Sequence, residues 1–114
     1  MPIQVNSVEG LQTYLRGVID RAGHHAPEVE EVIFTLAGAV VLFKDTNAPL
    51  EAFSRRGNIA NVLWATINGQ RYVFTYDHNN GQIVIKQGGT QGNVVGSFDN
   101  HTSARSVIRL FESL

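Results

Sequence analysis

The clearest pattern in this chain is a pair of consecutive β-hairpins within residues 61–87. The dipeptide Asn68-Gly69 separates the alternating segments NVLWATI and QRYVFTY, and a two-residue Asn-Gly connection favours a type I′ turn, whose two central residues have positive φ. Such a turn sets the register of the two strands. On one face it pairs Leu63 with Phe74, Ala65 with Tyr72 and Ile67 with Gln70.

A four-residue turn around residues 78–81 extends this face into a third strand without a change of register. Tyr76 then lies opposite Ile83, and Phe74 lies opposite Ile85. The resulting face is apolar along three strands, and we expect two helices to cover it. Its members are Leu63, Ala65, Tyr72, Phe74, Ile83 and Ile85.

The N-terminal segment has apolar residues at spacings of three and four, which is the period of an amphipathic helix. Asn6 or Ser7 can cap its start, whereas Gly23 and Pro27 favour its end. The apolar stripe consists of Val8, Leu11, Tyr14, Leu15, Val18 and Ile19, and the outer side carries Gln12, Arg16, Asp20 and Arg21.

A second amphipathic helix is predicted at the C-terminal end, where Asn100 or Thr102 can act as the cap. Shorter strands are predicted at residues 50–54 and 94–98. The apolar face of the C-terminal helix consists of Ala104, Val107, Ile108, Phe111 and Leu114.

The segment from Glu28 to Lys44 is ambiguous. As a helix it would have Pro27 before its first turn and apolar residues on nearly every side. As two strands it would contain VIFTLAG and AVVLFK on either side of Gly38. The abundance of β-branched and aromatic residues favours strands, because these side chains lose rotamer freedom in a helix.

These elements predict one α+β domain over residues 1–114. Its sheet is mainly antiparallel, has about five to six strands, and is flanked by an N-terminal and a C-terminal helix. We find no internal repeat or long linker in the sequence.

The second face of the same sheet is half apolar. It carries Trp64 among β-branched residues, with Arg71 and Lys86 interrupting the pattern. An exposed patch of this kind indicates a partner surface, here a two-fold homodimer. The expected interface residues are Val62, Trp64, Arg71, Val73 and Val84. In the alternative interpretation, residues 28–54 fold over this face and make it a second internal core.

Composition excludes several classes of protein. The formal net charge is −1, and the only adjacent basic pair is Arg55-Arg56, so we expect neither a nucleic-acid nor a membrane partner. The chain has no cysteine, which excludes disulfides and thiolate chemistry. Neither a signal peptide nor a membrane span is recognisable, so a cytoplasmic location is expected.

No cofactor, metal or catalytic signature is apparent. The four histidines, at positions 24, 25, 78 and 101, do not have the spacing of a zinc site. Asp77-His78 could serve as an acid/base pair, but Asp, Asn and Gly at such positions are typical of a hairpin turn. We therefore expect His78 to be exposed at a hairpin tip.

The runs NVLWATINGQRYVFTYDHNNG, GGTQGNVVGSFDN and RSVIRLFESL resemble small single-domain bacterial proteins, including products of mobile integron gene cassettes. The resemblance covers most of the second half of the chain. Because the shared motifs are turns and strands, the resemblance implies a bacterial, cytoplasmic and oligomeric protein and no particular activity.

The leading functional hypothesis is a non-enzymatic interaction module that self-associates through the Trp64 face. The alternative is a small-molecule-binding protein with a pocket between sheet and helices, and an enzyme is the third hypothesis. The binding hypothesis predicts a cavity reaching the carboxyl end of the central strand. Its expected ligand-binding residues are Tyr14, Tyr72, Tyr76 and Asp77.

Overall fold

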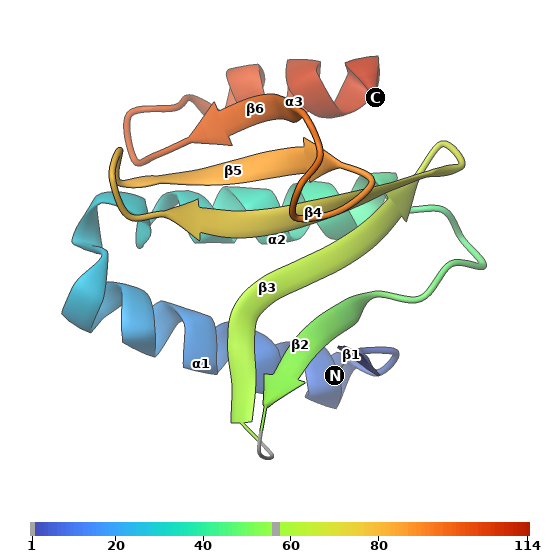
Figure 1. Cartoon of the computed structure of the whole chain (residues 1–114), viewed down its shortest axis with the longest axis horizontal. Coiled ribbons are helices and arrows are strands. Elements are labelled where there is room, and N and C mark those ends of the chain that lie inside the picture. The colour runs from blue at the N-terminus through green and yellow to red at the C-terminus, as the bar shows by residue number, and fades with distance from the viewer. Residues whose placement is uncertain (1, 56–57) are drawn as a thin grey trace.

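The computed structural model describes residues 2–55 and 58–114. Its elements follow one another as β1 (Pro2–Gln4), α1 (Val8–His25), the short 3-10 helix η1 (Pro27–Val29), α2 (Val32–Phe43), β2 (Glu51–Arg55), β3 (Asn58–Ile67), β4 (Gln70–Asp77), β5 (Gln82–Gln87), β6 (Val94–Phe98) and α3 (Ala104–Ser113). The six strands form one sheet in the order β1-β2-β3-β4-β5-β6. All neighbouring strands are antiparallel, which confirms the predicted α+β class (Figure 1).

The predicted register of the central strands is confirmed. Leu63 pairs with Phe74 between β3 and β4, and Tyr76 pairs with Ile83 between β4 and β5. Asn68 and Gly69 have φ values of 52° and 79°, as a type I′ turn requires. The Asp45 carboxylate accepts hydrogen bonds from the backbone N–H groups of both turn residues, at 2.7 and 2.8 Å, so the α2–β2 connection holds this hairpin in place.

All three helices lie on the same side of the sheet, behind the strands in Figure 1. Phe111 of α3 stacks on Phe74 of β4, with ring centroids 6.1 Å apart, and lies 5.8 Å from the ring of Phe43 at the end of α2. The apolar sheet face predicted from the hairpin register therefore forms the main core. Its buried sheet residues include Leu63, Ala65, Ile67, Tyr72, Phe74 and Ile85.

The preference for strands between Glu28 and Lys44 is wrong, because this segment forms η1 and α2. The helix penalty of a β-branched residue is below about 0.7 kcal/mol, and burial of one helix side against the sheet outweighs it. The alternative in which residues 28–54 fold over the second sheet face is also wrong, because α2 packs on the first face and β2 is a strand of the sheet itself.

A side chain distant in sequence fixes the start of α2. Oδ1 of Asn100 accepts hydrogen bonds from the backbone N–H groups of Glu31 and Val32, at 2.9 and 3.0 Å, and Nδ2 donates to the carbonyl of Pro27 at 2.8 Å. Asn100 or Thr102 was expected to cap the C-terminal helix. That helix is instead capped by Ser103, whose hydroxyl accepts from the N–H of Ser106 at 3.1 Å.

Ser7 caps α1, and its hydroxyl accepts from the N–H of Gly10 at 2.9 Å. The helix continues through Gly23 and ends at His25, two residues beyond the predicted stop. Because of this extension, His25 belongs to the helix and lines the cavity described below. The Arg55-Arg56 pair falls outside the part of the chain whose side chains the structure describes.

Candidate ligand-binding site

A cavity of about 250 Å³ lies between α1, η1 and α2 on one side and strands β3 to β5 on the other. Its walls are mainly aliphatic and aromatic, with Leu36 from α2 and Leu63 and Phe74 from the sheet. Ala22, Ala26 and Ala37 also line it. Because these side chains are small, they do not fill the space between the helices and the sheet, and the cavity remains.

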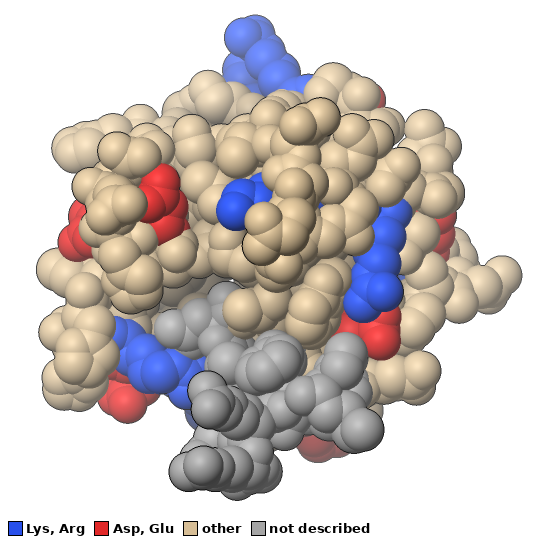
Figure 2. All heavy atoms as spheres, viewed as in Figure 1, with Lys and Arg blue, Asp and Glu red and all other residues tan. Residues whose placement is uncertain are grey.

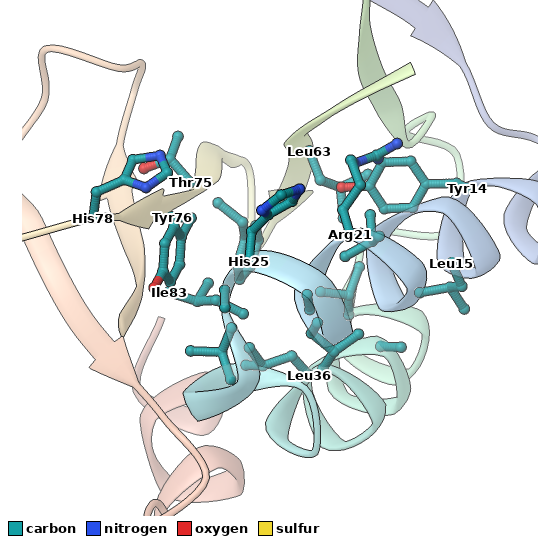
Figure 3. Close-up of a pocket in the computed structure, with 18 residues that line it drawn as sticks. Tyr14, Leu15, Arg21, His25, Leu36, Leu63, Thr75, Tyr76, His78 and Ile83 are labelled. Carbon is teal, nitrogen blue, oxygen red and sulfur yellow. The ribbon is translucent and has the colours of Figure 1, made fainter. Parts of the chain in front are cut away.

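Polar side chains gather at one end of this cavity. Tyr14, Arg21 and His25 come from α1, and Tyr76 and His78 come from β4 and the turn that follows it. Figure 3 shows Tyr76 and His78 on one side of the view and Tyr14 and Arg21 on the other, with His25 between them and Leu36 on the helix below. His25 and His78 are exposed, so the polar end faces the solvent. We call these five residues the polar rim.

Tyr14 is the buried member of the polar rim. Burial raises the pKa of its phenol, whereas the nearby Arg21 guanidinium lowers it. Burial has the larger effect, so the phenol remains neutral at physiological pH and keeps its O–H donor. Tyr14, Arg21 and His25 occupy positions i, i+7 and i+11 of one helix, and this spacing puts all three on the same side of α1.

A hydrogen bond from the hydroxyl of Tyr76 to the carboxylate of Glu28 joins the sheet to η1 beside the cavity. It raises the pKa of Tyr76 to about 12 and lowers the pKa of Glu28. The ring of His78 stands edge-on to Tyr76, with centroids 4.7 Å apart. Gly81 packs closely against Glu28, because a Cβ atom there would lie 3.0 Å from the Glu28 side chain.

Two of the four predicted ligand-binding residues, Tyr14 and Tyr76, line the cavity. Tyr72 is buried in the core but does not reach it. Asp77 does not reach it either, because its carboxylate accepts hydrogen bonds from Asn79 N–H at 3.0 Å and Asn80 Nδ2 at 2.8 Å, which lower its pKa. Asp77 is therefore a turn residue, and the expected exposure of His78 at this hairpin is confirmed.

Arg21 was expected on the outer side of the first helix, and the structure corrects this, since its side chain lines the cavity. His25 was not anticipated as a site residue. The spacing from Tyr14 to Arg21 and His25 is the sequence signal that could have found both Arg21 and His25. Thr75 borders the cavity, but its pairing with Val84 puts its side chain on the opposite face of the sheet.

The second face of the sheet carries Trp64, and we call it the Trp64 face. Its own side chains cover much of it. Val73 is fully buried although none of the described helices covers this side, because it lies between Trp64 and Lys86 on the neighbouring strands. Arg71 lies over the Trp64 ring, 5.3 Å from its centroid, and its guanidinium is 3.2 Å from the Glu51 carboxylate. Figure 2 shows that the described part of this side is mostly uncharged, with a few scattered basic and acidic side chains.

Lys86 donates to the carbonyl of Thr90 at 3.1 Å, and the N–H of Gly88 donates to the carbonyl of Arg71 at 2.8 Å. The β5–β6 connection thus bends back beside the Trp64 face. Of the predicted interface residues, Val73 and Val84 are buried within the single chain and have little surface left for a partner. Val62, Trp64 and Arg71 retain accessible surface, and self-association through this face stays a prediction.

In residues 2–55 and 58–114 no group of three or more His, Asp or Glu side chains is arranged to hold a metal ion. Over the same described residues, every helix is too short or too polar to cross a membrane.

The fold is thus an antiparallel sheet with helices on one side and a cavity between the two layers. The sequence model of one family, VCH_CASS14, described as "Integron cassette protein VCH_CASS1 chain", matches residues 11–109. Because this match spans most of the chain, the protein belongs to that integron cassette family, and the predicted resemblance is confirmed. No curated protein matches the chain. The family description names no ligand, substrate or partner.

Proposed function

We propose that this protein binds a small amphiphilic carboxylate, with the apolar part of the ligand in the cavity and its carboxylate at the polar rim. One observation carries the proposal: the apolar cavity between sheet and helices is also lined by hydrogen-bond donors and by one permanent positive charge, that of Arg21. Concave apolar sites with a few convergent polar groups are the usual form of small-molecule sites.

The volume limits the size of the ligand. A water molecule occupies about 30 Å³ of liquid, so about 250 Å³ accommodates on the order of ten non-hydrogen atoms at comparable density. A short fatty acid or a single substituted ring is of this size. Larger cofactors such as nucleotides are too large for the space.

The charges of the lining favour an anion over a cation. Among the lining residues that the structure describes, Arg21 is the one with a permanent charge, and none is acidic. Glu28 lies next to the rim, but its carboxylate already accepts the Tyr76 hydroxyl. A guanidinium can bind a carboxylate through two parallel N–H donors, and the neutral Tyr14 phenol supplies a further O–H donor.

Three ligands with the same chain length test this proposal: octanoate, octanol and octylamine. Octanoate should raise the melting temperature of the protein most, because a ligand that binds the native state stabilises it by mass action. Octanol should have a smaller effect, and octylamine should have none. Equal stabilisation by octylamine and octanoate, or no stabilisation by any of the three, would contradict the proposal.

Arg21→Met should weaken octanoate binding about tenfold or more, because it removes a charge-assisted hydrogen-bonding partner while keeping an apolar stem. Isothermal titration calorimetry measures this change. Arg16→Met is the matched control, since Arg16 lies on the same helix, is exposed, and does not line the cavity. Equal effects of the two substitutions would show that Arg21 does not contact the ligand.

A further inference from the structure

The side of α2 that faces away from the sheet is apolar and open. Phe34 is 63% exposed, Val41 is 52% exposed and Leu42 is 75% exposed. Val8, at the start of α1, is also largely exposed, and it lines the same shallow groove as Val41. We call Val8, Phe34, Val41 and Leu42 the α2 outer face.

The sequence of α2, VIFTLAGAVVLF, contains no charged residue, and its one hydroxyl side chain is Thr35. A helix that is apolar on all sides is usually surrounded by protein or lipid on all sides. Single exposed apolar residues are normal on a protein surface, whereas a contiguous group marks an interaction surface. The α2 outer face is such a group within the single chain.

We propose that the α2 outer face is the interface of a two-fold homodimer, in which the two α2 helices cross in antiparallel orientation at Gly38. A two-fold axis brings the same patch of both copies together. Phe34 precedes Gly38 by one helical turn and Leu42 follows it by one turn, so an axis at Gly38 places Phe34 of each copy against Leu42 of the other.

Gly38 suits the crossing point. A Cβ atom built there meets nothing within 4 Å, so the position is open toward the partner. A small residue at a helix crossing allows two backbones to approach closely. The large side chains on either side of Gly38 then pack against the partner helix and not against each other.

The charges at the two ends of α2 are complementary in this arrangement and distinguish a second copy from a membrane. Glu31 stands immediately before the helix and Lys44 immediately after it. In an antiparallel pair the Glu31 end of one copy lies near the Lys44 end of the other, which favours association. Glu28 and Glu30 add further negative charge near the start of α2, and these carboxylates repel an anionic bilayer surface.

The available area is sufficient for a dimer of modest affinity. Large apolar side chains at these exposures contribute on the order of 100 Å² each, so the four residues and the adjacent backbone provide roughly 500 Å² per copy. The pair then buries about 1,000 Å², which is near the lower limit for a specific interface. We therefore expect a dissociation constant in the micromolar range rather than an obligate dimer.

Sedimentation equilibrium on the full chain tests the interface. The wild-type protein should be a dimer at tens of micromolar, and Val41→Glu should raise the dissociation constant at least tenfold, because it places an unpaired charge in the contact. Val94→Glu is the matched control, since Val94 is 57% exposed on β6, and it should leave the dimer intact. Circular dichroism checks that both variants are folded.

A cysteine scan locates the two-fold axis, because the natural chain has no cysteine. Facing Cα atoms in closely packed helices lie within about 6 Å at the crossing point, which is within reach of a disulfide. Oxidised Gly38→Cys should therefore form a covalent dimer, whereas Val94→Cys should not.

Three results would overturn the proposal: a monomeric wild type at high concentration, a dimer that Val41→Glu does not weaken, or equal cross-linking of both cysteine variants. Co-sedimentation of the wild type with phosphatidylglycerol vesicles, abolished by Val41→Glu, would assign the α2 outer face to a membrane and would equally contradict the dimer.

Discussion

Two apolar surfaces of this protein, the Trp64 face of the sheet and the α2 outer face, have no other described element over them. Their side chains nevertheless differ in how much surface they expose to solvent. On the sheet, Val73 is fully buried by its cross-strand neighbours, and Arg71 covers part of the Trp64 ring. On α2, Phe34 and Leu42 keep more than half of their surface. An apolar pattern in the sequence therefore does not identify an interface by itself.

The geometry of the two elements explains this difference. Neighbouring strands are less than 5 Å apart, so side chains on one face of a sheet touch across the strands and shield one another. Side chains on the outer side of an isolated helix diverge from its axis and have no such neighbours. The same number of apolar residues consequently leaves more free surface on a helix than on a sheet.

The substitution Trp64→Arg tests this comparison most strongly. It removes a large ring from above Val73 and adds a second cation beside Arg71, so we expect a loss of about 3 kcal/mol in the free energy of unfolding. The dimer should persist in the fraction that stays folded, because the α2 outer face is unchanged. Urea unfolding and sedimentation equilibrium measure the two effects. A fully stable monomeric variant would show that the sheet face is the dimer interface.

Two valine substitutions should change the free energy of unfolding by less than Trp64→Arg does. Val73→Ala should lower the free energy of unfolding by about 2 kcal/mol, because it removes buried methyl groups and leaves a cavity. Val41→Ala should change it by less than about 0.5 kcal/mol, because the site is exposed and alanine favours a helix. Both values are taken from urea unfolding extrapolated to low protein concentration, where association does not contribute. Similar costs at the two sites would contradict the difference in burial.

The smallest expected effect concerns the Tyr76–Glu28 hydrogen bond at the cavity, an exposed contact that burial does not strengthen. Because this bond lowers the pKa of Glu28, its contribution to stability is present above the ordinary carboxyl pKa of about 4.3. That contribution is lost as the pH falls through the lowered pKa of the folded state. On the alkaline side, the contribution of Tyr76 is lost as the pH rises through its pKa of about 12.

The melting temperature of Tyr76→Phe should therefore lie slightly below that of the wild type at pH 7, and the difference should shrink below about pH 4. Tyr72→Phe makes the same chemical change at a buried position away from Glu28, and its difference from the wild type should not follow that pH dependence. A constant difference for Tyr76→Phe from pH 7 to pH 3 would show that Glu28 does not stabilise the fold through this bond.

The candidate site was only partly predictable from the sequence. Tyr14 and Tyr76 belong to strongly periodic elements, so their inward direction followed from the helix and strand patterns. Arg21 and His25 lie on the same side of α1 as Tyr14, but a charged residue near a helix end is usually solvated. Their role at the polar rim depends on where α1 lies relative to β4, and no local pattern contains that information.

Local chemistry determined the central hairpins, because Asn68-Gly69 favours one turn type that sets the register of β3 and β4, and the four-residue turn at 78–81 carries that register into β5. It also determined α1 and α3, whose apolar stripes have a single period. Tertiary structure alone decided the state of α2, since its residues suit a strand or a helix almost equally and small differences in propensity cannot settle the choice. Packing on the sheet and capping by Asn100, 68 residues beyond Val32, settle it for the helix. The same docking creates the cavity and leaves the α2 outer face exposed, because both depend on the position of one helix over the sheet.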